Sequence, residues 1–165
     1  DAAQCGLIRM RNRVPPGISA HCDAVARKAV ELALALEKAG IPLNRAVIEA
    51  SALLHDIARP SGREHPQIGA RLLLQEGYPQ VARVIASHHC LMEEDLQRVT
   101  ERTVLFLADK LIEEDREVTL SRRFERSREK CGSSQSLLAH AQQFDQAFAA
   151  QTLVERTLKA KDGLL

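Results

Sequence analysis

Five of the six histidines in this chain fall in its first two-thirds, and together with two aspartates they could bind metal ions. The set comprises His21, His55, Asp56, His65, His88, His89 and Asp109. Neutral imidazoles and ionised carboxylates are common ligands of transition-metal ions. A lone histidine on an apolar helix face is usually a hydrogen-bonded core residue, but five of them beside two aspartates favour a shared metal ion.

The helical period places these polar side chains on apolar faces. His21 lies four residues before Val25, so both belong to the same stripe of a helix. The same reasoning applies to the segments that carry His55, His65, His88, His89 and Asp109. Inward polar groups are costly unless they satisfy one another, and a metal ion would satisfy several at once. His55 and its neighbour Asp56 diverge by about 100° on a helix, so one ion reaches both only at the helix end.

Glycine, proline and capping residues divide the chain into helices. Ser19 and Asn44 can cap two helices, Gly40 can end the first of them, and Pro66 and Pro79 suit the first turns of two more. No segment alternates strongly enough to predict a strand. The sequence therefore predicts an all-α fold. The expected helices cover about residues 19–39, 44–58, 66–77, 79–89, 100–114, 120–130 and 134–161.

The composition excludes several classes of protein. The 165 residues are 45% hydrophobic and 27% charged, which is typical of one soluble globular domain. No apolar run approaches the roughly 18–20 residues that span a bilayer, and no secretory signal is recognisable, so we expect a cytoplasmic protein without a membrane partner. The four cysteines form no C-x-x-C pair, which argues against a zinc knuckle and favours free buried thiols.

The charge balance gives no strong signal for a nucleic-acid partner. The formal net charge is +1, whereas phosphate-backbone binding usually requires a basic excess. One basic cluster stands out in the C-terminal third, and such a cluster is more often a solvated helix face than a binding patch. We retain it as a weak candidate for phosphate contact. It consists of Arg122, Arg123, Arg126, Arg128 and Lys130.

The order of these motifs resembles a known family. His21, the His55-Asp56 pair and Asp109 resemble the H…HD…D signature of the HD-domain metal-dependent phosphohydrolases. The His65-Pro66 and His88-His89 segments are similar to the extra histidine positions of members that bind two metals. The resemblance covers about residues 18–114 and implies a compact helical bundle of the HD-domain type with about six to eight helices.

The resemblance also implies a ligand set for each ion. His21, His55, Asp56 and Asp109 would hold the first ion. His65, His88 and His89 would hold a second, and the Asp56 carboxylate would bridge the two. Mixed nitrogen and oxygen ligands suit one or two divalent ions of iron, manganese, cobalt, nickel or zinc better than magnesium, which prefers oxygen.

The implied activity is hydrolysis of a phosphoester or phosphoanhydride, with a small phosphorylated molecule such as a nucleotide as substrate. Metal ions would lower the pKa of a water molecule and so generate a hydroxide nucleophile. Asp56, Lys110 and Arg59 are the expected catalytic residues. Arg59, Lys110 and Arg63 are the expected contacts of the substrate phosphate, because cationic side chains stabilise phosphoryl oxygens.

Two other functions remain open at this stage. The bundle could be a regulatory module that binds a nucleotide or a metal without turnover, fused to a partner such as a nucleotidyltransferase. The ion could also be purely structural. Turnover with several metals would separate catalysis from regulation, and an open coordination position would argue against a structural ion.

The expected domain organisation has three parts. Residues 1–17 are interpreted as a linker or boundary segment, and residues 18–115 as the metal-binding core. Residues 116–165 are expected to form helices that pack on the core or in a homodimer. The sixth histidine, His140, lies in this last part and joins no recognisable pattern.

Overall fold

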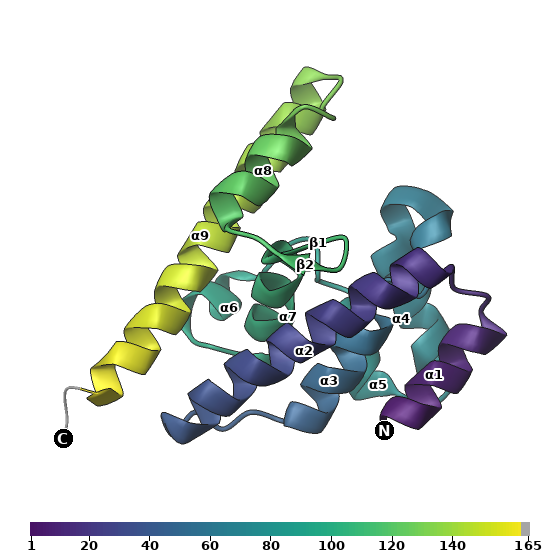
Figure 1. Cartoon of the computed structure of the whole chain (residues 1–165), viewed down its shortest axis with the longest axis horizontal. Helices are drawn as coiled ribbons and strands as arrows, with labels where there is room; N and C mark the ends of the chain where they lie inside the picture. The colour runs from purple at the N-terminus through teal and green to yellow at the C-terminus, as the bar shows by residue number, and fades with distance from the viewer. Residues whose placement is uncertain (163–165) are drawn as a thin grey trace.

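The structure is a computed structural model that describes residues 1–162, and within them it is mostly helical, which confirms the all-α fold (Figure 1). A short 3-10 helix, η1 (Arg59–Glu64), lies between α3 and α4. Nine α-helices are described, more than the six to eight expected, because α1 and the five-residue α6 also form. They are α1 (Ala2–Arg11), α2 (Pro16–Lys38), α3 (Arg45–Leu54), α4 (His65–Gln75), α5 (Pro79–Ile85), α6 (Glu93–Gln97), α7 (Glu101–Lys110), α8 (Leu120–Arg128) and α9 (Ser134–Asp162).

The segment 1–17, interpreted from the sequence as a linker or boundary segment, contains a helix. Residues 2–11 form α1, and the Asp1 side chain caps this helix by accepting a hydrogen bond from the Gln4 N–H. Cys5 and Ile8 lie three residues apart and are both buried, so one face of α1 packs on the bundle, where the helix contacts α3. The division into a core over 18–115 and C-terminal helices over 116–165 stays a prediction.

The helix ends follow the predicted capping signals in most places. Gly40 has a φ of 80° and follows Ala39, the C-cap of α2, and the Asn44 side chain accepts a hydrogen bond from the Val47 N–H at the start of α3. Ser19, however, is not a cap. Helix α2 begins at Pro16, because proline at the first helical position has the required φ and needs no N–H partner.

The core lies between α2, α3, α5 and α7, where α3 and α7 each contact the other three helices (Figure 1). Its side chains are almost entirely aliphatic, and the largest fully buried one is Phe106 of α7. Leu36, Ile48 and Ile85 contribute further fully buried side chains from α2, α3 and α5. Within residues 1–162, no helix combines the length and apolar character needed to cross a membrane.

After α7 the chain forms a β-hairpin and then a helical hairpin. Strands β1 (Ile112–Glu113) and β2 (Arg116–Glu117) are antiparallel, and two residues per strand are too few to produce a detectable alternation. Helices α8 and α9 then run side by side, joined by the edge-to-face rings of Phe124 and Phe144, whose centroids are 5.1 Å apart. The far end of this hairpin extends beyond the bundle (Figure 1), while the rest of α9 contacts α2, α6 and α7.

Gly69 of α4 allows a close approach to the turn that follows α3. A Cβ at this position would lie 2.9 Å from Cγ2 of the buried Ile57. We expect Gly69→Ala to lower the free energy of unfolding by about 1–2 kcal/mol, because the cost of overpacking exceeds the gain in helix propensity. Urea denaturation would measure the change. Gly6→Ala in α1 is the control, since a Cβ at that position would have no neighbour within 4 Å, and it should stabilise by about 0.5–1 kcal/mol.

Candidate metal centre

All seven predicted ligand residues lie around one centre, and most of them stand at helix ends. His21 comes from α2, and Asp109 from the last turn of α7. The others follow or begin a helix: His55 and Asp56 after α3, His65 at the start of α4, and His88 and His89 after α5. The predicted helices over 44–58 and 79–89 are therefore too long, since both end before their ligand residues.

Backbone carbonyl groups orient four of the imidazole rings. Nδ1 of His55, His65 and His88 donates to the carbonyl oxygen three residues earlier, at distances of 2.7–2.8 Å. Nδ1 of His21 donates to the carbonyl of Glu114 at 2.7 Å. Because a carbonyl oxygen only accepts hydrogen bonds, Nδ1 must carry the hydrogen in each ring, and Nε2 is left free to bind a metal.

The first group of donor atoms is formed by His21, His55 and Asp109, whose ligand atoms all lie within 4.8 Å of one another. Asp109 Oδ1 is 3.1 Å from His21 Nε2 and 3.6 Å from His55 Nε2. Asp109 and His55 are buried, and His21 is partly buried. These three residues come from three different helices or helix ends, so the fold rather than any local sequence brings them together.

The second group of donor atoms is formed by His65, His88 and His89, again with ligand atoms within 4.8 Å of one another. Asp56 connects the two groups. Its Oδ1 lies 2.8 Å from His65 Nε2 and 3.6 Å from His88 Nε2, and its Oδ2 lies 3.7 Å from His55 Nε2. The Asp56 carboxylate therefore lies within 3.7 Å of nitrogen atoms from both groups.

Burial and neighbouring charges set the protonation states. Burial lowers the pKa of His88 to about 4 and that of His89 to about 3. Burial alone would raise the pKa of Asp56, but the close contacts of its carboxylate with the rings of His65 and His88 hold that pKa well below its usual range. Two imidazoles are therefore neutral and this carboxylate is charged at neutral pH, which are the forms that metal ions require.

One of these nitrogen atoms lacks a hydrogen-bond partner and two others face each other, so the centre fits a metal ion. His55 Nε2 is buried and makes no hydrogen bond. His65 Nε2 and His88 Nε2 face each other at 3.1 Å, although neither can donate when Nδ1 holds the hydrogen. Two lone pairs at this distance repel, and a cation would convert the repulsion into binding. Each of the two groups could hold one ion.

The three cationic residues predicted to bind phosphate have different surroundings. Lys110 is buried, and its Nζ donates to Asp109 Oδ2 at 2.6 Å. Burial alone would raise the pKa of Asp109, but the ammonium of Lys110 and the contacts with His21 lower it well below its usual range. Arg59 is half-exposed, with one guanidinium nitrogen 3.4 Å from Asp56 Oδ1. Arg63 is exposed on η1.

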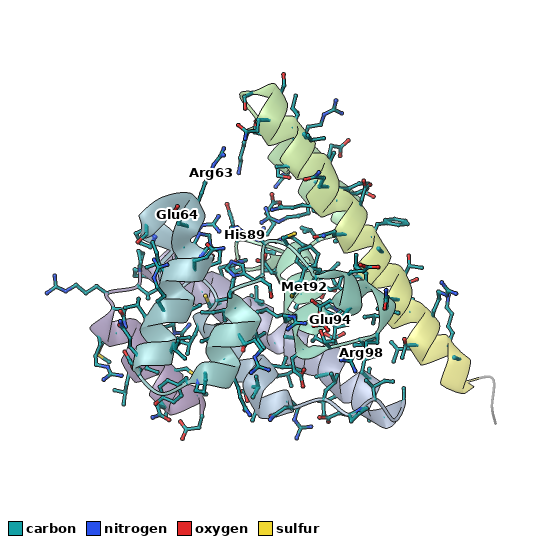
Figure 2. The ribbon with its side chains drawn as sticks, turned by 180° about the vertical axis from the view of Figure 1, so that it is seen from behind. Arg63, Glu64, His89, Met92, Glu94 and Arg98 are labelled. Atoms are coloured by element: carbon teal, nitrogen blue, oxygen red, sulfur yellow. The ribbon has the colours of Figure 1, made fainter. Side chains whose placement is uncertain are left out.

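A cavity of about 810 Å³ opens onto these residues. His21, Asp56, His65, His89 and Asp109 line it, whereas His55 and His88 lie behind them and are fully buried. Figure 2 shows His89 and Arg63 on the side of the bundle that faces the α8–α9 hairpin. Arg59, Arg63 and Lys110 also line the cavity.

The opposite wall of the cavity comes from α8, α9 and the turn between them, and sequence reasoning missed most of its residues. Six polar or charged residues line this wall, and His140 is one of them. Its Nε2 lies 2.7 Å from Ser127 Oγ and 2.9 Å from the Phe124 carbonyl oxygen. The only indication in the sequence was the basic cluster, and two of its members, Arg123 and Lys130, line the cavity. The six residues, called the hairpin wall below, are Arg123, Ser127, Lys130, Ser136, His140 and Gln143.

The four cysteines are free, as expected, but only two of them are buried. Cys5 and Cys22 are buried, whereas Cys90 is exposed and Cys131 is partly exposed in the cavity. Cys22 Sγ lies 3.8 Å from His55 Nδ1, so this thiol packs behind the centre. No cysteine is among the donor atoms of either group.

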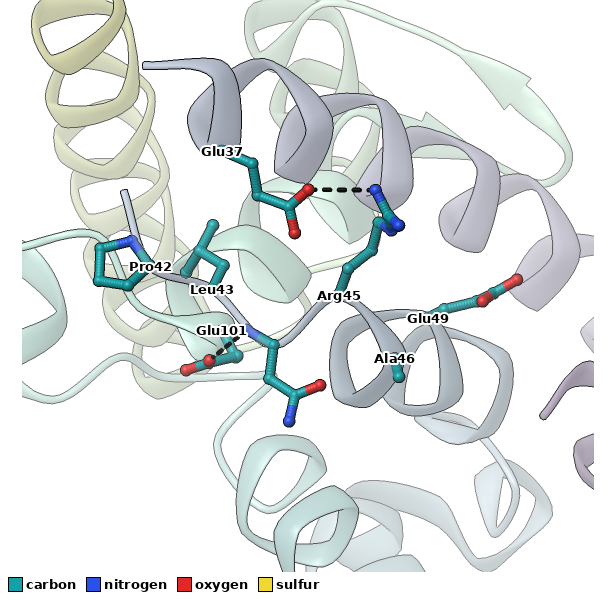
Figure 3. A pocket seen from close by; sticks show the side chains of 8 residues that line it. Glu37, Pro42, Leu43, Arg45, Ala46, Glu49 and Glu101 are labelled. Atoms are coloured by element: carbon teal, nitrogen blue, oxygen red, sulfur yellow. Dashed lines mark hydrogen bonds and ion pairs between the residues drawn. The ribbon is translucent and has the colours of Figure 1, made fainter. Parts of the chain in front are cut away.

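A second hollow lies at the start of α3, away from the histidines (Figure 3). The Glu37 carboxylate pairs with Arg45 at 3.1 Å across it. Glu101 accepts a hydrogen bond from the Asn44 N–H at 2.9 Å. These charged groups are partnered within the protein, and the hollow contains no histidine or cysteine, so it offers no comparable set of ligands.

Metal binding should stabilise the folded protein measurably. A ligand at 100 times its dissociation constant adds about 2.7 kcal/mol to the free energy of unfolding, which corresponds to a rise in Tm of about 5–10 °C at this chain length. We expect this rise when manganese, iron, cobalt, nickel or zinc is added to protein stripped with a chelator, and a smaller one with magnesium. Differential scanning fluorimetry would measure it. An unchanged Tm with every metal would contradict the assignment.

Comparisons with known proteins agree with this centre. Residues 18–114 match the HD domain family. An uncharacterized protein of Methanocaldococcus jannaschii is 34% identical over 82 residues, which are 48% of this chain and 48% of that protein. This chain therefore spans about half the length of that relative. No solved structure matches.

Proposed function

Because the match to residues 18–114 covers more than half of its length, the chain belongs to the HD-domain family, and we propose that it is a metal-dependent phosphohydrolase. The observation that carries this proposal is the set of inward donor atoms with carbonyl-oriented rings, among them the unpartnered Nε2 of His55. A structural role for the ion is less consistent with this arrangement, because the centre opens into a cavity large enough for a substrate.

The chain's own residues would hold the ions in a fixed arrangement. His21, His55 and Asp109 would bind one ion, the residues of the second group would bind another, and Asp56 would contact both. When bound, the ions would supply Lewis-acid chemistry that activates water and neutralises charge on the phosphoryl oxygens. The carbonyl groups that bind Nδ1 would keep the rings from turning.

Three cationic side chains would assist in different ways. Lys110 is a positioning residue, because its ammonium is committed to Asp109 Oδ2 and would hold that carboxylate toward its ion. Arg59 is free to turn from Asp56 toward a phosphoryl oxygen, since half of its side chain is exposed. Arg63 stands farther out on the cavity rim and would contact the rest of the substrate. The guanidinium groups suit phosphate because they bind its oxygens as a fork.

We propose a small phosphorylated molecule such as a nucleotide as the substrate, acted on in the cytoplasm. The cavity volume of about 810 Å³ lies within the range of about 300–1,000 Å³ that is typical of small-molecule sites. The cavity lining contains one aromatic residue, Phe124, so contacts to phosphate rather than base stacking should dominate recognition.

A metal-dependent activity screen tests the proposed function. Protein stripped of metal would be reloaded with each candidate ion and assayed against nucleoside mono-, di- and triphosphates, dinucleoside polyphosphates and simple phosphoesters. We expect turnover that depends on metal and disappears with a chelator. Metal binding without turnover of any phosphate compound would instead indicate a regulatory module.

A further inference from the structure

The hairpin wall faces the metal centre across the cavity, and we infer that it binds a second phosphate group of the substrate. This inference rests on the proposed function, which places the reacting phosphate at the His/Asp side. The geometry points to a substrate with two separated phosphate groups rather than a simple monophosphate ester. The wall lies beyond residue 114, outside the part of the chain that matches the family.

The hairpin wall carries cations that have no counterion within the protein. Among the side chains that the structure describes, Arg123 and Lys130 make no ion pair, and neither does Arg63 on the opposite rim. Arg126 lies on the same helix but does not line the cavity, and it pairs with Glu113 at 2.7 Å. Unpaired cations that share a cavity repel one another, and a multiply charged anion would relieve that repulsion.

Arg123 supplies an independent observation. Its Nε atom is buried and has no hydrogen-bond partner among the described residues. Buried donors normally have a partner, so this atom lacks an acceptor that the described residues do not supply, in a residue that lines the cavity. A phosphate oxygen would fill that place and could accept from a second guanidinium nitrogen at the same time.

Neutral polar side chains complete the wall. Ser127 follows Arg123 by one helical turn, and Ser136, His140 and Gln143 face the same cavity from α9. Glu114 is the one carboxylate lining the cavity that has no ion-pair partner among the described residues. Three unpaired cations against one unpaired carboxylate leave the outer cavity positive, which favours an anionic group.

Binding of phosphonates that cannot be hydrolysed tests this inference. The metal-loaded protein would be titrated calorimetrically with methylphosphonate and with methylene-, propylene- and hexylene-bisphosphonate. We expect at least one bisphosphonate to bind about tenfold or more tightly than methylphosphonate. The double variant Arg123→Gln/Lys130→Gln should lose this gain, while its affinity for methylphosphonate stays within about twofold of the unchanged protein.

A matched control is available on the same helix. Arg122→Gln/Arg128→Gln removes two exposed arginines that do not line the cavity, and it should keep the full gain. The inference is overturned if no bisphosphonate binds more tightly than methylphosphonate, or if the gain persists in the Arg123→Gln/Lys130→Gln variant. A gain without turnover in the activity screen would reject the phosphohydrolase and leave the second phosphate site standing. Turnover without a gain in bisphosphonate affinity would support the phosphohydrolase and reject the second phosphate site.

Discussion

Replacing Asp56 by alanine should abolish both metal binding and activity. Asp56 lies between the two groups of donor atoms, so its loss removes a ligand from each proposed ion at once. It also leaves His65 Nε2 without the carboxylate oxygen now 2.8 Å away. We expect kcat/KM to fall at least about 10³-fold, since metal ions supply several kcal/mol of transition-state stabilisation. Metal analysis and steady-state kinetics would measure both losses.

The Asp56→Ala experiment needs a control variant that removes a negative charge away from the metal centre. Asp145→Asn alters an exposed carboxylate on α9 and should leave metal content and kcat/KM unchanged. Asp56→Asn preserves the side-chain shape and separates loss of charge from loss of packing. Full activity in Asp56→Ala, with the fold confirmed by circular dichroism, would show that Asp56 is not the bridging ligand.

The largest effect on stability should come from Asp95, which is fully buried in the short helix α6. Both of its carboxylate oxygens accept from Arg102 Nε, at 3.0 and 2.9 Å, and Oδ1 also accepts from the Thr100 hydroxyl at 2.6 Å. Asp95→Asn should lower the free energy of unfolding by about 3–5 kcal/mol. It removes the negative charge from a buried ion pair and leaves the Arg102 charge without its partner. Urea denaturation monitored by circular dichroism would measure it.

Glu94→Gln is the natural comparison for Asp95→Asn. Glu94 pairs with the same arginine, but its side chain is 52% exposed. Exposed ion pairs contribute about 0–1 kcal/mol, so this variant should change stability little. If the two variants lowered the free energy of unfolding equally, burial of Asp95 would not determine the strength of its ion pair with Arg102.

Much of the centre could be predicted from the sequence because helical spacing and the order of the motifs both constrain it. His21 and Asp109 lie within helices and on faces that the apolar pattern identifies. His55, His65 and His88 were expected to face inward along helices, yet each stands at or just beyond a helix end. The pattern of apolar residues continues past such an end, so it cannot show where the backbone stops being helical.

The remaining features depend on contacts between distant parts of the chain. The hairpin wall reaches the cavity only because α8 and α9 pack against each other and α9 packs on the bundle. His140 approaches Ser127 from 13 residues away, and no local pattern encodes this pairing. Helix α1 was missed for another reason, since only Cys5 and Ile8 of its ten residues are buried and three arginines lie nearby.

The hydrogen bonds between the histidines and backbone carbonyl groups determine which substitutions can test the centre cleanly. His55, His65 and His88 each satisfy the carbonyl oxygen three residues earlier, at the point where a helix or helical turn ends. Each imidazole ring therefore stabilises, through this hydrogen bond, the turn on which the histidine itself lies. Histidine-to-alanine exchanges would fray these turns as well as remove a ligand, and a loss of activity would then mix two causes. Asparagine or glutamine exchanges at the carboxylates separate chemistry from folding more cleanly.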